Sequence, residues 1–120
     1  MAKTDEEELI QRYFDAFNSH DLDGVMACFH GKPTIVDPEG RRFEGRDDVR
    51  RHYEKSFALL PDGRCDLRSM AAHDGRGMAE SLFHGTWARD NRVLKALGVE
   101  VVEFADGKIK EIRDYHRLLE

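Results

Sequence analysis

The sequence lacks several features that would each assign it to a class of protein. It has no apolar run of about 20 residues, the length that a membrane-crossing helix requires. The acidic run Asp5–Glu8 stands where a signal peptide would carry an apolar stretch. There is no block of Lys and Arg, and the net charge of the 120 residues is −5. We therefore expect a cytoplasmic protein that binds neither nucleic acid nor membranes.

Cysteines and the motifs of metal or nucleophile chemistry are equally scarce. Cys28 and Cys65 lie in unrelated segments without Cys-x-x-Cys spacing, so free thiols are favoured over a disulfide. No histidine belongs to a His-Glu-x-x-His pattern, and no Gly-x-Ser-x-Gly sequence occurs. Gly75-Arg76-Gly77 lacks the strand-to-helix context of a phosphate-binding loop and indicates a hairpin turn. These absences predict chemistry without a metal ion or a cofactor.

The first half of the chain has apolar residues at helical spacing. Three helices are predicted, and capping or breaking residues mark their ends: Thr4-x-x-Glu7 and residues 18–20 for the first, Asp21 for the second, Arg46 and Pro61 for the third. A short extended segment at about 33–37 lies between the second and third helices. It ends at the turn sequence Pro38-Glu39-Gly40.

Beyond Pro61 the pattern changes to long strands separated by turn signals. Four strands are predicted, at about 64–73, 76–89, 93–105 and 108–118. Helices followed by an antiparallel meander predict an α+β fold, in a single domain over residues 1–120. Strands of this length must curve to cover the helices, and a curved sheet leaves a cavity between the two layers.

Several stretches resemble bacterial ketosteroid isomerase, and through it the NTF2-like superfamily. They are Gln11-Arg12-Tyr13, Asp21-Leu22-Asp23-Gly24, Thr34-Ile35-Val36-Asp37-Pro38, Arg50-x-x-Tyr53 and Val99-Glu100-Val101-Val102-Glu103-Phe104. The resemblance spans nearly the whole chain and points to the ketosteroid isomerase and SnoaL-like (polyketide cyclase-like) branch. It implies a cone-shaped fold, with three helices packed on a curved, mostly antiparallel sheet that encloses a pocket.

The resemblance also implies roles for individual residues. The tyrosine of the family's oxyanion hole falls on Tyr13, its acid falls on Glu100, and the proton-shuttling carboxylate falls on Asp37. The chain departs from the isomerase in two places. Glu100 replaces an aspartate, and Asp114 and His116 stand where the isomerase keeps apolar residues. Both departures make the pocket more polar and resemble the polyketide cyclase and hydratase relatives.

The residues themselves leave alternatives open. Tyr13 shares an apolar helical stripe and can be a core residue, and Asp37 precedes a proline and can be a turn residue. Alternation along the strand favours an inward Glu100, whose pKa burial would raise. Asp114 and His116 share one strand face, inward or exposed, and are candidates for additional acid–base work. The expected wall of a substrate pocket consists of Phe17, Phe57, Trp87, Val102 and Phe104.

The leading functional hypothesis is a cofactor-independent isomerase that moves a proton on a small hydrophobic carbonyl compound. Asp37 would be the base, and Tyr13 with Glu100 would stabilise the enolate. One alternative is a SnoaL-like cyclase or hydratase, and the other is a non-catalytic module for small-molecule binding or dimerisation. The expected partners are a small hydrophobic ligand and a second copy of the chain, bound through the outer sheet face that carries Leu82 and Val101.

Overall fold

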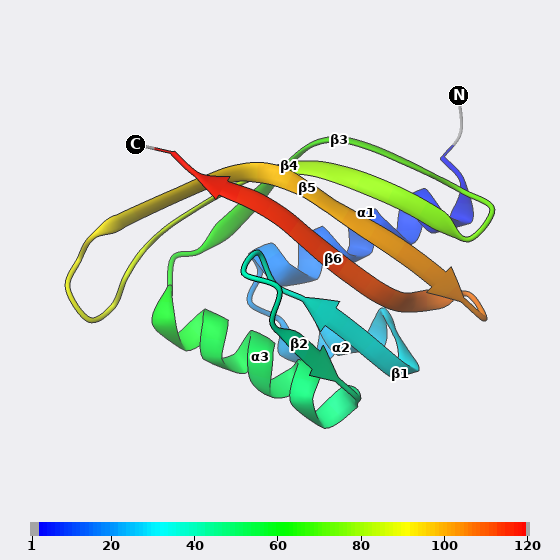
Figure 1. Cartoon of the computed structure of the whole chain (residues 1–120), viewed down its shortest axis with the longest axis horizontal. Helices are drawn as coiled ribbons and strands as arrows, with labels where there is room; N and C mark the ends of the chain where they lie inside the picture. The colour runs from blue at the N-terminus through cyan, green and yellow to red at the C-terminus, as the bar shows by residue number, and fades with distance from the viewer. Residues whose placement is uncertain (1–2, 120) are drawn as a thin grey trace.

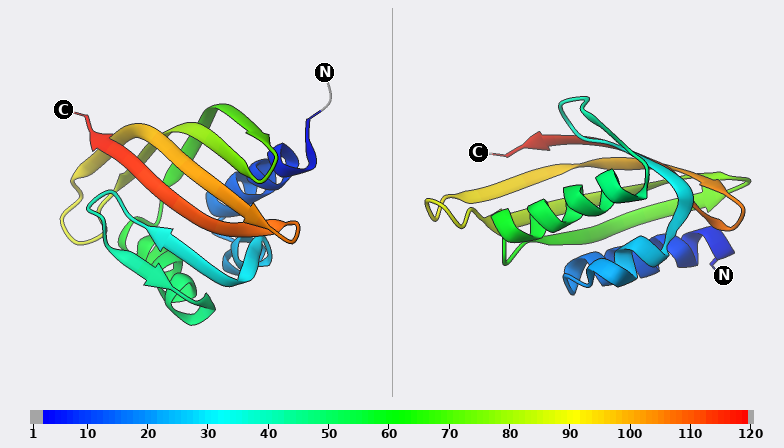
Figure 2. Two further views of the ribbon diagram at one scale, coloured as in Figure 1. Left: turned by 45° about the vertical axis from the view of Figure 1, so that its right-hand side comes forward. Right: turned by 90° about the horizontal axis from the view of Figure 1, so that it is seen from below.

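The computed structural model describes residues 3–119, which form an α+β fold of three helices and one six-stranded sheet (Figure 1). The elements follow one another as α1 (Asp5–Asn18), α2 (Leu22–Ala27), β1 (Phe29–Val36), β2 (Arg42–Glu44), α3 (Arg46–Leu59), β3 (Arg64–His73), β4 (Arg76–Thr86), β5 (Val93–Ala105) and β6 (Lys108–Leu118). All three helices lie on the same side of the curved sheet (Figure 2). No helix within residues 3–119 is long and apolar enough to cross a membrane.

The predicted capping residues position the helices. Thr4 and Glu7 form the expected capping box, in which each side chain accepts a hydrogen bond from the other residue's backbone N–H. The α1 stripe then buries Leu9, Ile10, Tyr13 and Phe14 against the sheet. Asp21 caps α2 by accepting from the backbone N–H of Gly24 at 3.0 Å.

The sheet has the strand order β2-β1-β6-β5-β4-β3. Every neighbouring pair is antiparallel except β1 and β6, which run parallel. The tight turns form where Asp-Gly was predicted, because Asp74 and Gly75 both have positive φ, at 55° and 84°, as a two-residue hairpin turn requires. Asp106 and Gly107 repeat this conformation.

Three strand predictions need correction. β1 begins at Phe29 and not at 33. Gly31 and Pro33 are residues that disfavour a strand, so the sequence did not show that the strand passes through them with an irregular register. β2 was not expected, because its three residues are too few to show a period. β4 ends at Thr86 instead of 89, because Trp87 begins a turn in which its N–H donates to the carbonyl of Arg92.

The core lies between the helices and the concave face of the sheet. Its buried members come from α1, α2, α3 and all the long strands. Both cysteines are buried and free, as expected. Ionisable groups also lie at this interface: Asp37 and Glu100 are only 7% and 6% exposed.

Candidate functional site

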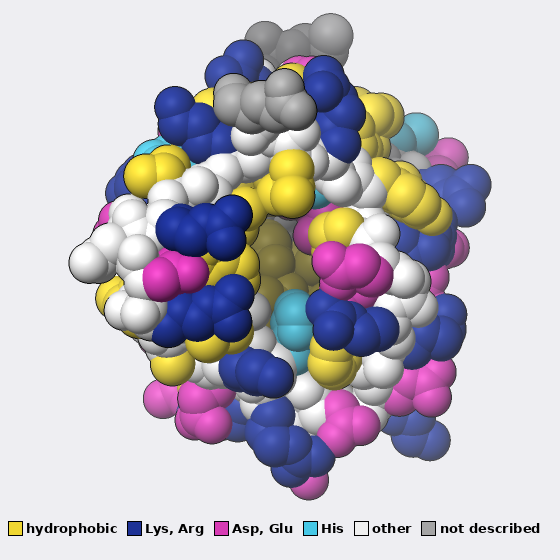
Figure 3. All heavy atoms as spheres, turned by 60° about the vertical axis from the view of Figure 1, so that its left-hand side comes forward, with side chains coloured by type: hydrophobic (Ala, Val, Ile, Leu, Met, Phe, Trp, Pro, Cys, Tyr) yellow, Lys and Arg dark blue, Asp and Glu magenta, His cyan; other side chains and the backbone are white. Residues whose placement is uncertain are grey.

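One cavity of about 790 Å³ lies between the helices and the concave face of the sheet. Figure 3 looks into it at the end of the molecule where β4 turns into β5, and shows hydrophobic walls and a rim with many Lys and Arg side chains. Five residues that the sequence had marked for chemistry line this one cavity, namely Tyr13, Asp37, Glu100, Asp114 and His116. The question left open for Asp114 and His116 is thereby answered, since both are on the inner side.

Strand register brings the polar residues together. Glu100 on β5 stands directly opposite Asp114 on β6, and Ser81 on β4, Gly98 on β5 and His116 on β6 lie in one row across three strands. Gly98 lies between Ser81 and His116 and has no side chain that would block the space between them. A Cβ at this position would lie 2.1 Å from the carbonyl oxygen of Tyr115. The imidazole of His116 therefore reaches across β5 to Ser81.

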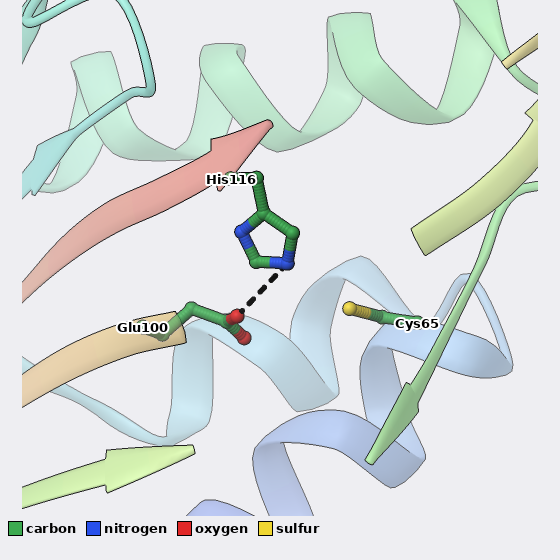
Figure 4. A group of neighbouring side chains, drawn as sticks. All are labelled: Cys65, Glu100 and His116. Atoms are coloured by element: carbon green, nitrogen blue, oxygen red, sulfur yellow. Dashed lines mark ion pairs between the residues drawn. The ribbon is translucent and has the colours of Figure 1, made fainter. Parts of the chain in front are cut away.

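The hydroxyl of Ser81 is the centre of a buried hydrogen-bond network. It donates to Glu100 Oε1 at 2.6 Å and lies 3.0 Å from Nε2 of His116, while the thiol of Cys65 donates to it at 3.1 Å. Figure 4 shows the side chains of Cys65, Glu100 and His116 converging from three strands, with Nε2 and Oε1 3.4 Å apart. On its other side His116 is hydrogen-bonded through Nδ1 to Asp114.

The surroundings of Glu100 and His116 raise the pKa of both groups, so both are more readily protonated than in water. Burial raises the pKa of Glu100 to about 8, and the negative charge of Asp114 adds to the effect, although the Ser81 hydrogen bond and His116 oppose it. This is the direction that the sequence predicts for Glu100. Burial alone would lower the pKa of His116, but the hydrogen bond and charge of Asp114 outweigh it and the net pKa is raised. At neutral pH Glu100 is mainly a neutral acid.

Glu100 has one oxygen left for a ligand. Its Oε1 is occupied by Ser81 and His116, whereas Oε2 has no hydrogen-bond partner among residues 3–119. No buried side-chain oxygen or nitrogen in the described part of the chain lacks a partner, so Oε2 is not sealed away from the cavity that Glu100 lines. A carboxyl oxygen of raised pKa therefore faces the space where a ligand would lie.

Asp37 lines the same cavity but is fully engaged. Its Oδ1 accepts from the backbone N–H groups of Glu39 and Arg41, and its Oδ2 accepts from Nε of Arg41 at 2.7 Å. Burial would raise the pKa of Asp37, but the hydrogen bonds and charge of Arg41 prevail and the pKa is lowered. Asp37 is therefore an ionised turn residue whose two oxygens already have donors.

A pair of tyrosines lies on the helical side of the cavity. The hydroxyls of Tyr13 (α1) and Tyr53 (α3) are 2.6 Å apart, and both residues line the cavity. Burial raises the pKa of both, so both stay protonated. One hydroxyl hydrogen is used within the pair, and the other has no acceptor among residues 3–119. The pair can thus donate one hydrogen bond to a ligand oxygen.

The expected wall is right for two residues and wrong for three. Phe17 and Trp87 line the cavity. Phe57 instead stacks on His20, with ring centroids 4.4 Å apart, and packs behind Phe17. Val102 is in the closed core, and Phe104 lies by a smaller hollow near Leu9 at the far end of β5. Alternation identifies the inner face of a strand, but not how far along a 13-residue strand the cavity extends.

Sequence reasoning missed Tyr53 and Ser81 as site residues. Ser81 is completely buried between the inward positions of Ala79 and Phe83, and a small polar residue on an apolar strand face was the signal available. It also missed that ligand-type atoms of Cys65, Glu100 and His116 come within 4.8 Å of one another, because they lie on three separate strands. That spacing could admit a metal ion. The Ser81 hydroxyl is hydrogen-bonded to all three side chains, so the same residues also form a connected hydrogen-bond network.

The sequence model of the SnoaL-like domain family matches residues 10–112, and the chain belongs to this family. None of the curated protein sequences matches the chain. The family and the solved structures that follow confirm the resemblance to SnoaL-like and ketosteroid isomerase-like proteins.

Solved structures share the fold. A protein from Xanthomonas campestris pv. campestris that was proposed to be a polyketide cyclase has a TM-score of 0.86 and 21% identity, over 94% of this chain and 90% of that one. SalBIII, an epoxide hydrolase/cyclase-like enzyme of pyran ring formation in the polyether salinomycin, has a TM-score of 0.84 and 22% identity, over 92% and 89%. A ketosteroid isomerase-like protein from Catenulispora acidiphila, in complex with trimethylamine, has a TM-score of 0.82 and 14% identity, over 90% and 84%.

Proposed function

We propose that the chain is a cofactor-independent enzyme that moves a proton on a small hydrophobic carbonyl compound, with isomerisation as the reaction. The observation that carries this proposal is Glu100 Oε2, a carboxyl oxygen of raised pKa in an otherwise largely apolar cavity. A general base works best when its pKa lies near the working pH, and the pKa of about 8 places Glu100 in that range.

Glu100, and not Asp37, is the proton shuttle in this proposal. In its ionised form Glu100 takes a proton from the carbon next to the carbonyl, and the electron pair of that C–H bond forms the enolate. In a β,γ-unsaturated ketone this enolate is a dienolate, and the same proton then returns to its γ carbon. The carbonyl is restored, the double bond moves into conjugation with it, and Glu100 is ionised again. Asp37 does not take this role in the proposal, because both of its oxygens accept hydrogen bonds and its pKa is lowered.

The other polar residues support this step. The Tyr13–Tyr53 pair donates its remaining hydroxyl hydrogen to the enolate oxygen, which stabilises charge only as it develops. Ser81 and His116 hold Oε1 and so aim Oε2, and Asp114 fixes the imidazole through Nδ1. Ser81, His116 and Asp114 are positioning residues, since their polar atoms bond to one another or to Glu100.

A ring-forming or hydrating reaction is the second candidate, and the neutral form of Glu100 favours it. A protonated Glu100 can donate to a carbonyl or epoxide oxygen as a general acid, with a ligand hydroxyl or water as the nucleophile. SalBIII, with which the chain shares its fold, is described as an epoxide hydrolase/cyclase-like enzyme.

The test requires no knowledge of the natural substrate. Hydrophobic cyclic ketones are incubated with the protein in D₂O, and deuterium incorporation next to the carbonyl is followed by NMR, together with isomerisation of a β,γ-unsaturated ketone. Exchange that is faster than in buffer supports the proposal. If a planar phenol binds but no ketone exchanges deuterium or isomerises, the cavity is not a proton-transfer site, and the general-acid or non-catalytic functions remain.

We also propose that the chain forms a homodimer through the outer face of the sheet. Met78 and Tyr115 on that face are 47% and 60% exposed. Val101 on β5 pairs with Met78, and Leu82 lies four residues further along β4 on the same face. Exposed apolar sheet faces usually mark an interface. Sedimentation should give a dimer at micromolar concentration for the native chain and a monomer for Tyr115→Glu, and a native chain that stays monomeric would contradict the proposal.

A further inference from the structure

Three basic residues line the mouth of the cavity, and they differ in what neutralises them. Arg41 is committed, because its Nε lies 2.7 Å from Asp37 and its Nη2 lies 2.5 Å from Glu39. The side chains of Arg92 and Lys95 are exposed and have no carboxylate partner among residues 3–119. Within residues 3–119, two of the three cations at the mouth therefore have no carboxylate that neutralises them.

The acids of the cavity do not balance these two cations. Asp37 and Glu39 are paired with Arg41, and Asp114 is bonded to His116. Asp90, on the same turn as Arg92, accepts from the backbone N–H of Arg92, and its other oxygen lies 3.8 Å from Nε of Arg89. Within residues 3–119, the acids near the opening that Figure 3 shows are thus engaged elsewhere and do not pair with Arg92 or Lys95.

Apolar side chains accompany the two cations. Val93 and Leu118 are 70% and 69% exposed and line the same cavity, beside Trp87. Glu100 follows Lys95 by five positions on β5, roughly 17 Å along the strand. An apolar path therefore leads from the cations to the polar network.

We propose that Arg92 and Lys95 form an anion-binding subsite, so that the preferred ligand has an apolar body with a carboxylate or phosphate at the end away from Glu100. The proposal rests on the proposed function only for where the reacting carbonyl lies. The subsite itself depends on the mouth and not on any proton transfer.

Ligand affinity tests the subsite directly. Trp87 is the only tryptophan and lines the cavity, so ligand binding is followed by its fluorescence. The probes are a planar naphthol, the same naphthol with a carboxylate at its distal end, and the same naphthol with a phosphate there. The variants are Arg92→Gln, Lys95→Gln and the double variant. Arg68→Gln is the control, since Arg68 is an exposed cation on β3 that does not line the cavity.

The native chain should bind the anionic probes more tightly than the neutral one. Each single variant should weaken the anionic probes about fivefold, the value of an exposed ion pair near 1 kcal/mol, and the double variant about 25-fold. Raising the salt from about 0.05 M to about 0.5 M should reduce the preference, because the ion pairs are exposed. The neutral probe should bind all variants alike, and the tighter of the two anionic probes identifies the anion.

Equal affinity of the native chain for neutral and anionic probes would overturn the proposal. An effect of Arg68→Gln as large as that of Arg92→Gln would also overturn it, since general charge attraction would then be the cause. Failure of the proposed function has a different signature, in which the charge preference persists while no ketone exchanges deuterium. Absence of binding by every probe rejects the subsite.

Discussion

Two regions of the cavity wall each contain one buried carboxylate, and the pKa of that carboxylate is shifted in opposite directions in the two regions. At the turn after β1, Asp37 is 7% exposed and has a lowered pKa. In the middle of β5, Glu100 is 6% exposed and has a pKa raised to about 8. The exposed fraction of the side chain is the same in the two regions, but Glu100 is surrounded by far more protein than Asp37, and this deeper burial is the main cause of its raised pKa.

The two pKa values also differ because the backbone of each region offers the carboxylate different hydrogen-bond donors. A turn presents free N–H groups, and two of them point at Asp37 while Arg41 reaches back from the same turn. A central strand has its N–H groups committed to neighbouring strands, so Glu100 meets only side chains, with Asp114 as a like charge opposite. Backbone type thus helps to separate a carboxylate that is held ionised from one that is held protonated.

The largest expected effect comes from replacing each carboxylate by its amide. Glu100→Gln keeps the size and an acceptor for Ser81 but removes the base, so proton transfer should fall by about 10²–10⁴-fold. Asp37→Asn keeps an acceptor for the two turn N–H groups and should leave turnover within about threefold. Deuterium exchange and isomerisation rates measure both. The reverse result would restore Asp37 as the base, the role that its resemblance to the family implied.

The pH dependence of stability should have opposite signs in the two regions. From about 4.5, the ordinary pKa of a glutamate, to about 8, the folded state holds a proton on Glu100 that the unfolded state has lost. The free energy of unfolding therefore declines as pH rises through this window, and Glu100→Gln should flatten the decline. Asp37 contributes stability above its ordinary pKa of 3.8, and this is lost as pH falls through its lowered folded pKa.

Urea unfolding across pH 3 to 9 distinguishes the two carboxylates. Glu100→Gln should change the free energy of unfolding only above about pH 4.5, and Asp37→Asn should change its pH dependence only at acidic pH. The matched control is Glu54→Gln, because Glu54 is exposed on α3 and does not line the cavity. His116, whose pKa is also raised, adds a decline of its own above its ordinary pKa of 6.5. A decline between about 4.5 and 6.5 that survives in Glu100→Gln would therefore mean that a group other than Glu100 causes it.

The sequence was sufficient for the helices, the long strands and the inward side of Glu100, because capping residues, turn glycines and alternation are local signals. It was insufficient where the chemistry depends on partners. That Asp37 is tied to Arg41 follows from how the turn closes, and that Ser81 meets His116 follows from the register of three strands. Neither contact can be recognised from the spacing of residues in the sequence. Resemblance placed the five polar residues in one cavity, but it could not say which carboxylate is free.

The smallest expected effect sharpens the comparison within the β5 region. Ser81 donates to Glu100 and lowers its pKa, in opposition to burial. Ser81→Ala should therefore raise the pKa of Glu100 further and shift the rising limb of the pH–rate profile to higher pH, with the maximal rate changed less than in Glu100→Gln. A carbon NMR titration of the Glu100 carboxyl measures the shift directly. Ser69→Ala is the matched control, because Ser69 donates to Glu80 on the outer part of the sheet, away from the cavity. Ser81→Thr should restore the hydrogen bond and bring the pKa back towards the native value. A carboxyl that titrates identically in Ser81→Ala and the native chain would show that Ser81 only fills space, and the pKa of Glu100 would then be set by burial, Asp114 and His116.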